Sequence, residues 1–245
     1  MNKGREILLF LFLSIVLYLL FWPVPVDPAI WEPPHSPALE GDYAPNNYLV
    51  NVERFGLGDG IGPEDVDVDA FGNIYTGYEE GKIIRYKPDG SRGELFSHTG
   101  GRPLGLEFDK YGNLIVADAI EGLLSIDPSG KITVLTKGTK DVKFGFADDL
   151  DIAPDGTIYF SDASSKTGIT DYRHDIVDHR PYGSLFAYDP QSKRTYLVEG
   201  NMYFANGVAV SPEGDFVLVN ETSEYRVRKV WIKGNMLGKS EILMD

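Results

Sequence analysis

The sequence predicts an all-β protein organised as a β-propeller, with four short strands recurring in each of about four units. Three observations carry this prediction. The chain repeats a polar turn around Gly72, Gly112, Gly156 and Gly214, at spacings of 40, 44 and 58 residues. An alternating strand precedes each turn and a more continuously apolar strand follows it. The chain is also rich in Gly, Pro, Tyr and Phe, a composition typical of turn-rich β proteins.

The N-terminus predicts a membrane anchor. Residues 1–6 carry Lys3 and Arg5, and the stretch 7–26 that follows is almost entirely apolar. Basic residues before an apolar span favour a cytoplasmic N-terminus, so we expect 7–26 to be a transmembrane signal-anchor and the remainder to be extracytoplasmic, in a periplasm, a lumen or outside the cell. The alternatives are a cleaved signal peptide and a buried helix. The Pro-Val-Pro-Val segment after the apolar run offers no small-residue cleavage site, which favours retention.

A proline-rich linker and a lone strand follow the anchor. Residues 27–46 read as a stiff, extended linker. Tyr48–Phe55 is expected to be a strand without a blade of its own, which in a propeller completes the last blade and closes the ring. The predicted domain, residues 47–245, therefore consists of this closing strand and about four blades.

The blades are expected at about 60–99, 100–138, 145–200 and 202–245. The longer spacing between Gly156 and Gly214 predicts an insertion, Ser164–Tyr182, in the third blade. This insertion has three interpretations: a short amphipathic lid over the channel mouth, a solvated loop, or a separate metal site. A β-sandwich is the competing fold, but its strands would not repeat in register. Four blades with a spare strand also indicate part of a larger ring, with an open sheet edge.

Composition excludes several classes of function. The chain has no cysteine, so disulfides, Cys-based zinc sites, iron–sulfur clusters and thiol catalysis are excluded. Its formal net charge of −14 argues against nucleic acid as a partner, because phosphate binding needs a basic surface. The acidic excess fits either simple solubility or an acidic cleft that attracts a cation.

One position in the repeat predicts a metal site. The residues eight positions before the four glycines open the innermost strand of each blade, and we expect them to meet at one mouth of the central channel. They are Glu64, Leu104, Asp148 and Asn206. Three of the four carry side-chain oxygens, the ligands that Ca²⁺ prefers.

A second position in the repeat carries side-chain oxygens as often as the first. It holds Asp67, Glu107 and Asp151, on the side of the inner strand opposite the apolar residues. For both positions the alternative is that the polar side chains only satisfy backbone groups in turns and caps.

Linked motifs point to a known family. They are Ile158–Ser165, Tyr182–Pro190, Tyr203–Pro212 and Phe216–Thr222, with shorter matches at Gly62–Val66 and Gly101–Gly105. In these motifs the chain resembles the strictosidine synthase-like branch of the gluconolactonase/regucalcin superfamily, which includes the paraoxonases. The resemblance covers most of residues 48–245.

The resemblance implies a six-bladed propeller with a divalent cation, usually Ca²⁺, in its central channel. It implies Glu64, Asp148 and Asn206 as metal ligands, although the family has asparagine where this chain has Asp148. The fifth-blade aspartate, a ligand and proposed base in lactonases, would lie beyond Asp245. The arginine that binds substrate in gluconolactonases is not found, and Phe146 stands in its place.

The function predicted on this basis is Ca²⁺-dependent hydrolysis of small lactones or esters. Asp149 and His179 are the candidates for a catalytic acid or base. The alternatives are a non-catalytic, membrane-anchored binding or scaffold propeller with a structural cation, and a strictosidine synthase-type enzyme that forms C–C and C–N bonds. The 245-residue chain by itself is expected to be inactive.

Overall fold

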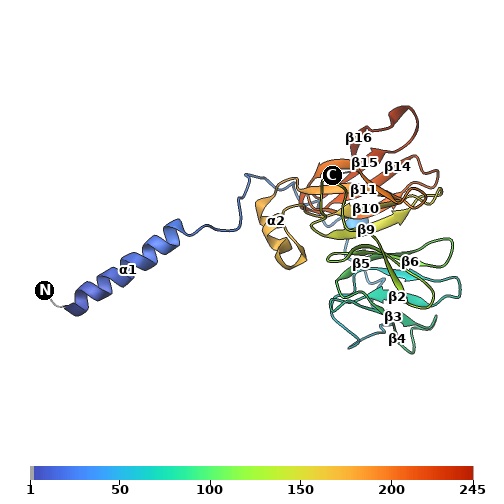
Figure 1. Ribbon diagram of the computed structural model, residues 1–245, viewed down its shortest axis with the longest axis horizontal. Coiled ribbons are helices and arrows are strands. Elements are labelled where there is room, and N and C mark those ends of the chain that lie inside the picture. The colour runs from blue at the N-terminus through green and yellow to red at the C-terminus, as the bar shows by residue number, and fades with distance from the viewer. Residues whose placement is uncertain (1–2, 245) are drawn as a thin grey trace.

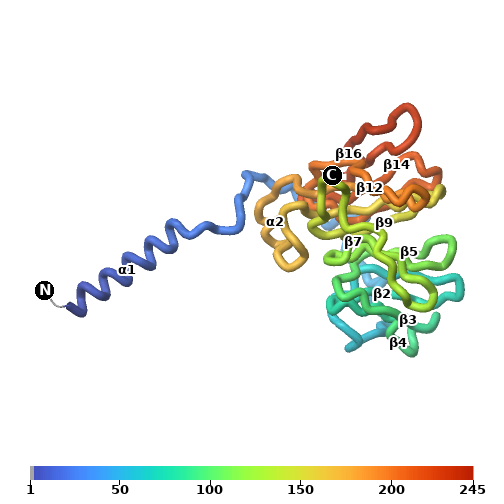
Figure 2. The backbone as a smooth tube through the Cα atoms, viewed as in Figure 1, coloured from blue at the N-terminus to red at the C-terminus, as the bar shows by residue number. Residues whose placement is uncertain are grey.

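The computed structural model describes residues 3–244 and contains one long apolar helix and four four-stranded antiparallel sheets (Figure 1). In every sheet the four strands follow one another both in the chain and in space, which is the arrangement of propeller blades. The tube view shows the four sheets succeeding one another from the first blade to the last (Figure 2). The all-β propeller prediction is confirmed.

Helix α1 spans Lys3–Phe21, projects away from the sheets and buries none of its residues against them (Figure 1). Its mean hydropathy of 2.1 makes it apolar enough to cross a membrane, and 19 residues of helix extend ~28 Å. The helix begins before residue 7 and ends before residue 26. Pro23 explains the earlier end, because the residue before a proline avoids the helical region.

The first two blades lie between residues 66 and 136. The first consists of β1 (Val66–Val68), β2 (Ile74–Gly77), β3 (Lys82–Tyr86) and β4 (Glu94–His98). The second consists of β5 (Pro103–Phe108), β6 (Leu114–Asp118), β7 (Gly122–Ile126) and β8 (Ile132–Thr136).

The last two blades follow the same plan. The third consists of β9 (Ala147–Ile152), β10 (Ile158–Asp162), β11 (Gly183–Asp189) and β12 (Arg194–Met202), so it runs two residues past the predicted 200. The fourth consists of β13 (Ala205–Val210), β14 (Phe216–Glu221), β15 (Arg226–Trp231) and β16 (Ser240–Met244).

The insertion in the third blade forms a short helical segment. A single 3-10 turn, Ile169–Asp171, leads into α2, Tyr172–Asp178. The other 3-10 turns are Gly41–Tyr43, Thr222–Glu224 and Gly234–Met236.

The predicted polar turns form for a clear local reason. The Asp69 carboxylate accepts hydrogen bonds from the backbone N–H groups of Phe71 (2.8 Å) and Asn73 (2.9 Å), and Gly72 takes the left-handed φ of +83°. Asp109 and Gly112 repeat this geometry in the second blade. The recurring glycine therefore marks the hairpin between the first two strands of a blade.

The hydrophobic core lies between neighbouring blades. Tyr75 and Ile83 of the first blade pack with Leu114 of the second in one buried cluster. Equivalent clusters join the second blade to the third and the third to the fourth. Each blade is therefore stabilised mainly by its neighbours, and the inner strands are held at fixed positions around the channel.

The strand predicted over Tyr48–Phe55 does not form. Residues 48–51 lie in turns, the following residues have no regular structure, and Tyr48, Leu49 and Val50 are exposed. Each of the four described blades takes all four of its strands from its own stretch of chain, so none of them lacks a strand for this segment to supply.

Candidate metal centre at the channel mouth

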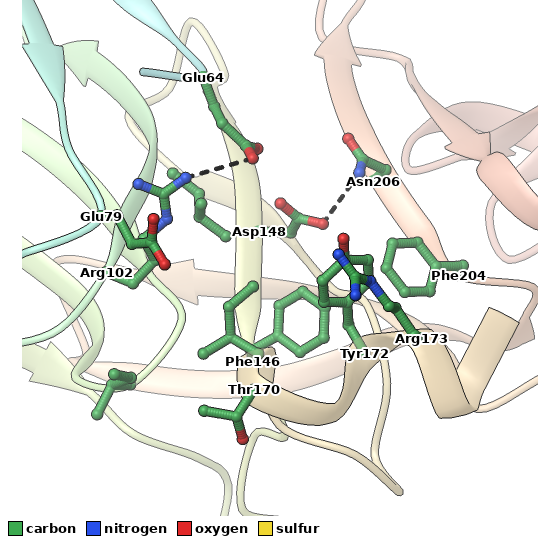
Figure 3. A pocket seen from close by; sticks show the side chains of 13 residues that line it. Glu64, Glu79, Arg102, Phe146, Asp148, Thr170, Tyr172, Arg173, Phe204 and Asn206 are labelled. Carbon is green, nitrogen blue, oxygen red and sulfur yellow. Dashed lines mark hydrogen bonds and ion pairs between the residues drawn. The ribbon is translucent and has the colours of Figure 1, made fainter. Parts of the chain in front are cut away.

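The four residues that occupy the first polar position of the repeat line one cavity. Glu64, Leu104, Asp148 and Asn206 all line a pocket of about 560 Å³. Leu104, Asp148 and Asn206 each lie second in the innermost strand of their blade, and Glu64 lies just before β1, so the repeat brings all four to the same end of the channel. The three polar side chains extend toward a common space (Figure 3).

Two polar contacts connect the walls of this pocket. Asn206 Nδ2 donates to Asp148 Oδ2 over 3.1 Å, joining the third and fourth blades. Arg102 Nη2 donates to the carbonyl oxygen of Gly62 (2.7 Å) and lies 3.5 Å from Glu64 Oε1, joining the first and second (Figure 3). Because Asn206 uses its Nδ2 in the contact with Asp148, its amide oxygen can serve as a metal ligand.

The electrostatics of the pocket favour a cation. Burial, followed by the nearby charges of Glu64 and Asp149, raises the pKa of the Asp148 carboxyl to about 8, and the positive charge of Arg102 only partly opposes this rise. The charged form of Asp148 would therefore be stabilised by a cation bound beside it. Two carboxylates and an amide oxygen are hard donors, so these residues fit a Ca²⁺-type ion. No group of three or more His, Cys, Asp or Glu that could hold a metal occurs within residues 3–244, so further ligands would have to be backbone oxygens or water.

The pocket has an apolar floor that the insertion completes. Leu104, Phe146 and Phe204 form a buried cluster, and Ile169 and Tyr172 of the insertion pack against it. Thr170 and Arg173 of the same segment also line the cavity. The insertion thus forms one wall of the channel mouth, as a lid would.

The sequence-based prediction of the site did not include several residues that line the pocket. Arg102 and Arg173 bring two guanidinium groups to the pocket, and Glu79 adds a carboxylate. Arg102 could have been found, because it lies two residues before Leu104 of the repeat column. Arg173 carries no such signal, because its position depends on how the insertion folds.

The second acidic position of the repeat is structural. Asp67 Oδ2 accepts the backbone N–H of Phe108 (2.6 Å), and Asp151 Oδ2 accepts that of Val210 (2.6 Å). Each aspartate therefore joins the inner strand of its own blade to that of the next blade.

Asp149 makes the same kind of link. Its Oδ2 accepts the backbone N–H of Val208 over 2.7 Å, and the residue is not among those lining the pocket. Burial raises the pKa of the Asp149 carboxyl to about 6.

His179 lies outside the pocket lining and contacts the proline-rich linker. Its ring lies 4.2 Å from that of Trp31, and its Nε2 is 3.1 Å from Glu224 Oε1. Trp31 also stacks on Tyr225 with ring centroids 5.7 Å apart. The linker is thus fixed beside the end of α2.

Backbone contacts strengthen this linker docking. The N–H groups of Asp27 and Ala29 donate to Asp178, the last residue of α2, and Arg180 Nε donates to the Asp27 carbonyl over 2.8 Å. Residues 27–31, called the strap below, therefore lie against the helix whose other end lines the pocket.

We expect loss of the strap to loosen α2. Trp31→Ala removes the ring packed on His179 and Tyr225, and amide hydrogen exchange over residues 172–178 should accelerate about tenfold, which corresponds to about 1.4 kcal/mol. The matched control is Trp22→Ala, which alters a tryptophan outside the strap. Equal exchange rates in both variants would show that the strap does not hold the helix.

Comparison with known proteins identifies the family. The strictosidine synthase family profile matches residues 148–235, and the profile of the strictosidine synthase-like N-terminal region matches residues 41–86. The chain belongs to the strictosidine synthase-like family. A strictosidine synthase-like 6 protein of Arabidopsis thaliana is 37% identical over 245 residues, covering 96% of this chain and 64% of the relative. The adipocyte plasma membrane-associated protein of Salmo salar is 34% identical, covering 95% of this chain and 59% of the relative.

The strictosidine synthase-like chain spans about three fifths of the length of these curated relatives. Its fold matches a gluconolactonase of Xanthomonas campestris with a TM-score of 0.61 at 16% identity, over 74% of this chain and 61% of that one. It also matches regucalcin of Agrobacterium tumefaciens, described as a calcium-binding protein, with a TM-score of 0.56 at 15% identity, over 75% and 59%. At these identities the likeness establishes the propeller fold.

Proposed function

We propose that this chain carries the metal-binding face of a Ca²⁺-dependent hydrolase that acts on small lactones or esters. The observation that carries the proposal is the meeting of Glu64, Asp148 and Asn206 in one pocket, where Arg102 only partly offsets the effect of burial and neighbouring carboxylates on Asp148. The gluconolactonase and regucalcin fold matches are consistent with it.

The residues of the pocket have distinct parts in this proposal. Glu64, Asp148 and Asn206 would hold the ion, which, when bound, supplies Lewis acidity toward a carbonyl oxygen. Arg102 and Arg173 would attract the carboxylate released by ester or lactone hydrolysis. Phe146, Phe204 and Tyr172 would exclude water from the apolar part of the substrate.

The described residues of the pocket do not supply an obvious catalytic base for this proposal. Neither Asp149 nor His179 lines the pocket, and both are engaged elsewhere by Val208 and Glu224. This observation favours a second candidate function, a membrane-anchored binding or scaffold propeller in which the cation is structural.

Metal binding tests the ligand assignment. Asp148→Ala should weaken Ca²⁺ binding by at least tenfold, since it removes the side-chain oxygens that lie between Glu64 and Asn206 in the donor set. Affinity is measured by calorimetry on the chain in lipid nanodiscs. Asp141→Ala, which alters an exposed carboxylate outside the pocket, should bind like the unchanged chain. Equal affinity in both variants would refute the assignment.

Turnover separates the two candidate functions. The 245-residue chain, and a longer product if the gene encodes one, are assayed on phenyl acetate and a lactone panel with Ca²⁺ and then with a chelator. Turnover that disappears on chelation supports the hydrolase. A lowered melting temperature on chelation without turnover on any substrate supports the scaffold. The 245-residue chain should bind the ion without turnover.

We also propose that α1 anchors the chain with its N-terminus in the cytoplasm and the propeller on the opposite side. Lys3 and Arg5 before the apolar run support this orientation. Because the chain has no cysteine, single substitutions Gly4→Cys and Ser91→Cys report the two sides separately. An impermeant thiol reagent applied from outside should label only the cysteine at position 91, and the reverse pattern would show the opposite orientation.

A further inference from the structure

A second cavity lies at the other end of the same inner strands. It measures about 730 Å³, within the range of small-molecule sites. The channel-mouth pocket uses the starts of β5 and β9, at Leu104 and Asp148. The second cavity uses their ends, at Phe108 and Ile152, together with the turns that follow.

Both walls of this cavity come from complete neighbouring blades. All its lining residues fall between positions 107 and 193, in the second and third blades. The interior is largely apolar, with Ile115, Ile158 and Tyr188 belonging to the buried cluster that joins these blades. The cavity is therefore a wedge in the interface between two blades and shares none of its lining with the channel mouth.

The acidic groups of the cavity are already satisfied or uncharged. Asp109 accepts hydrogen bonds from Tyr111 and Asn113 in its turn, and Asp155 lies 3.2 Å from Lys233 Nζ. Burial, together with the neighbouring charge of Asp151, raises the pKa of Glu107 to about 8, so this carboxyl is mostly neutral at pH 7.

The basic groups of the cavity form no ion pairs among the described residues. Lys110 and Lys193 are exposed on two of the turns that line it, and within residues 3–244 neither has an ion-pair partner. The Lys110 ammonium lies 5.3 Å from the centre of the Tyr111 ring. Lys110 and Lys193 are therefore the two cationic groups of the rim that are free to meet an anion beside an apolar interior.

We propose that the wedge between the second and third blades binds a small monocarboxylate with an aromatic or short aliphatic body. The apolar body lies between the two sheets, against Ile115, Ile158 and Tyr188. The carboxylate lies at the rim, where Lys110 and Lys193 supply the opposite charge. The site is independent of the proposed hydrolase function.

The test measures binding of trifluoromethyl-phenylacetate to the 245-residue chain in lipid nanodiscs by fluorine NMR, with empty nanodiscs as the blank. The double variant Lys110→Gln/Lys193→Asn should bind the carboxylate at least tenfold more weakly. Its affinity for the corresponding neutral primary amide should be unchanged. Asparagine is chosen because position 193 has a φ of +54°, which asparagine tolerates. Lys131→Gln, in the equivalent turn of the second blade and outside the lining, is the matched control.

A second variant locates the site. Ser125 lines the cavity from β7, so Ser125→Phe should fill it and abolish binding of both the carboxylate and the amide. Thermal unfolding verifies that each variant is folded, and the surface lysine variant decides the charge requirement even if Ser125→Phe does not fold. Absence of binding at millimolar probe, or undiminished binding in the lysine variant, would overturn the proposal.

Discussion

Replacing Glu221 by glutamine is expected to lower the free energy of unfolding by about 3 kcal/mol or more. The Glu221 side chain is 0% exposed at the end of β14. Its oxygens accept hydrogen bonds from Arg226 Nε (2.7 Å), Arg228 Nε (3.0 Å) and the Tyr203 backbone N–H (3.0 Å). Glutamine removes the charge that two largely buried guanidinium groups need. Urea unfolding measures the loss, and Glu213→Gln in an exposed turn should change stability by less than about 0.5 kcal/mol.

The same carboxylate predicts a pH dependence. Burial by itself would raise the pKa of Glu221, but hydrogen bonds from Arg226 and Arg228 outweigh it and hold the pKa below its usual value. A carboxyl with a depressed folded-state pKa contributes stability above its unfolded pKa, about 4.3, and loses this contribution as the pH falls through its folded pKa. The stability difference between the unchanged chain and Glu221→Gln should therefore be constant near neutrality and shrink below about pH 4. A difference that grew with acidity would contradict this account.

Replacing Gly145 by alanine is expected to destabilise the third blade by more than about 3 kcal/mol. A Cβ at this position would overlap the carbonyl oxygen of Ser164, and a backbone atom cannot move aside as a side chain can. Gly145 precedes β9, whose start is fixed by the hydrogen bond from the Phe146 N–H to Asp162 Oδ1 (2.8 Å). Forcing this segment outward would also displace Asp148, so Ca²⁺ binding should fall with stability.

Gly168→Ala is the matched control for this substitution. Gly168 lies in the insertion against which Gly145 packs, but the nearest atom to an added Cβ is the carbonyl oxygen of Gly145, at 4.0 Å. Thermal unfolding and Ca²⁺ calorimetry of both variants compare the two positions. If alanine at position 145 retained normal stability and ion affinity, the close packing of this strand on the insertion would not control the site.

The repeat made the fold and the meeting of the oxygen-bearing residues predictable from sequence. A glycine with a left-handed φ has few substitutes in a tight hairpin, so Gly72 and Gly112 mark the same turn in successive blades. Equivalent positions in such repeats lie at equivalent heights around the channel, which is why Glu64, Asp148 and Asn206 line one pocket as predicted. The assignment of a cation to them stays a prediction.

The repeat could not distinguish a site from a structural link. Asp148 and Asp151 lie three residues apart on one strand, yet the first lines the pocket and the second binds the Val210 N–H of the next blade. In the sequence, both positions carry a side-chain oxygen in three of the four blades. Their roles differ because only the packing of neighbouring blades determines which carboxylate meets a backbone donor.

By itself, the sequence determined the apolar N-terminal helix, the four-stranded unit and its recurrence, because these depend on local periodicity and turn chemistry. Only the tertiary structure decided that Tyr48–Phe55 is not a strand, that residues 27–31 dock on α2, and that Arg102 and Arg173 reach the channel mouth. Those features depend on contacts between segments far apart in the chain, such as the pairing of Arg180 with Asp27. Residue spacing carries no information about such contacts, because they form only when the blades and the insertion have packed.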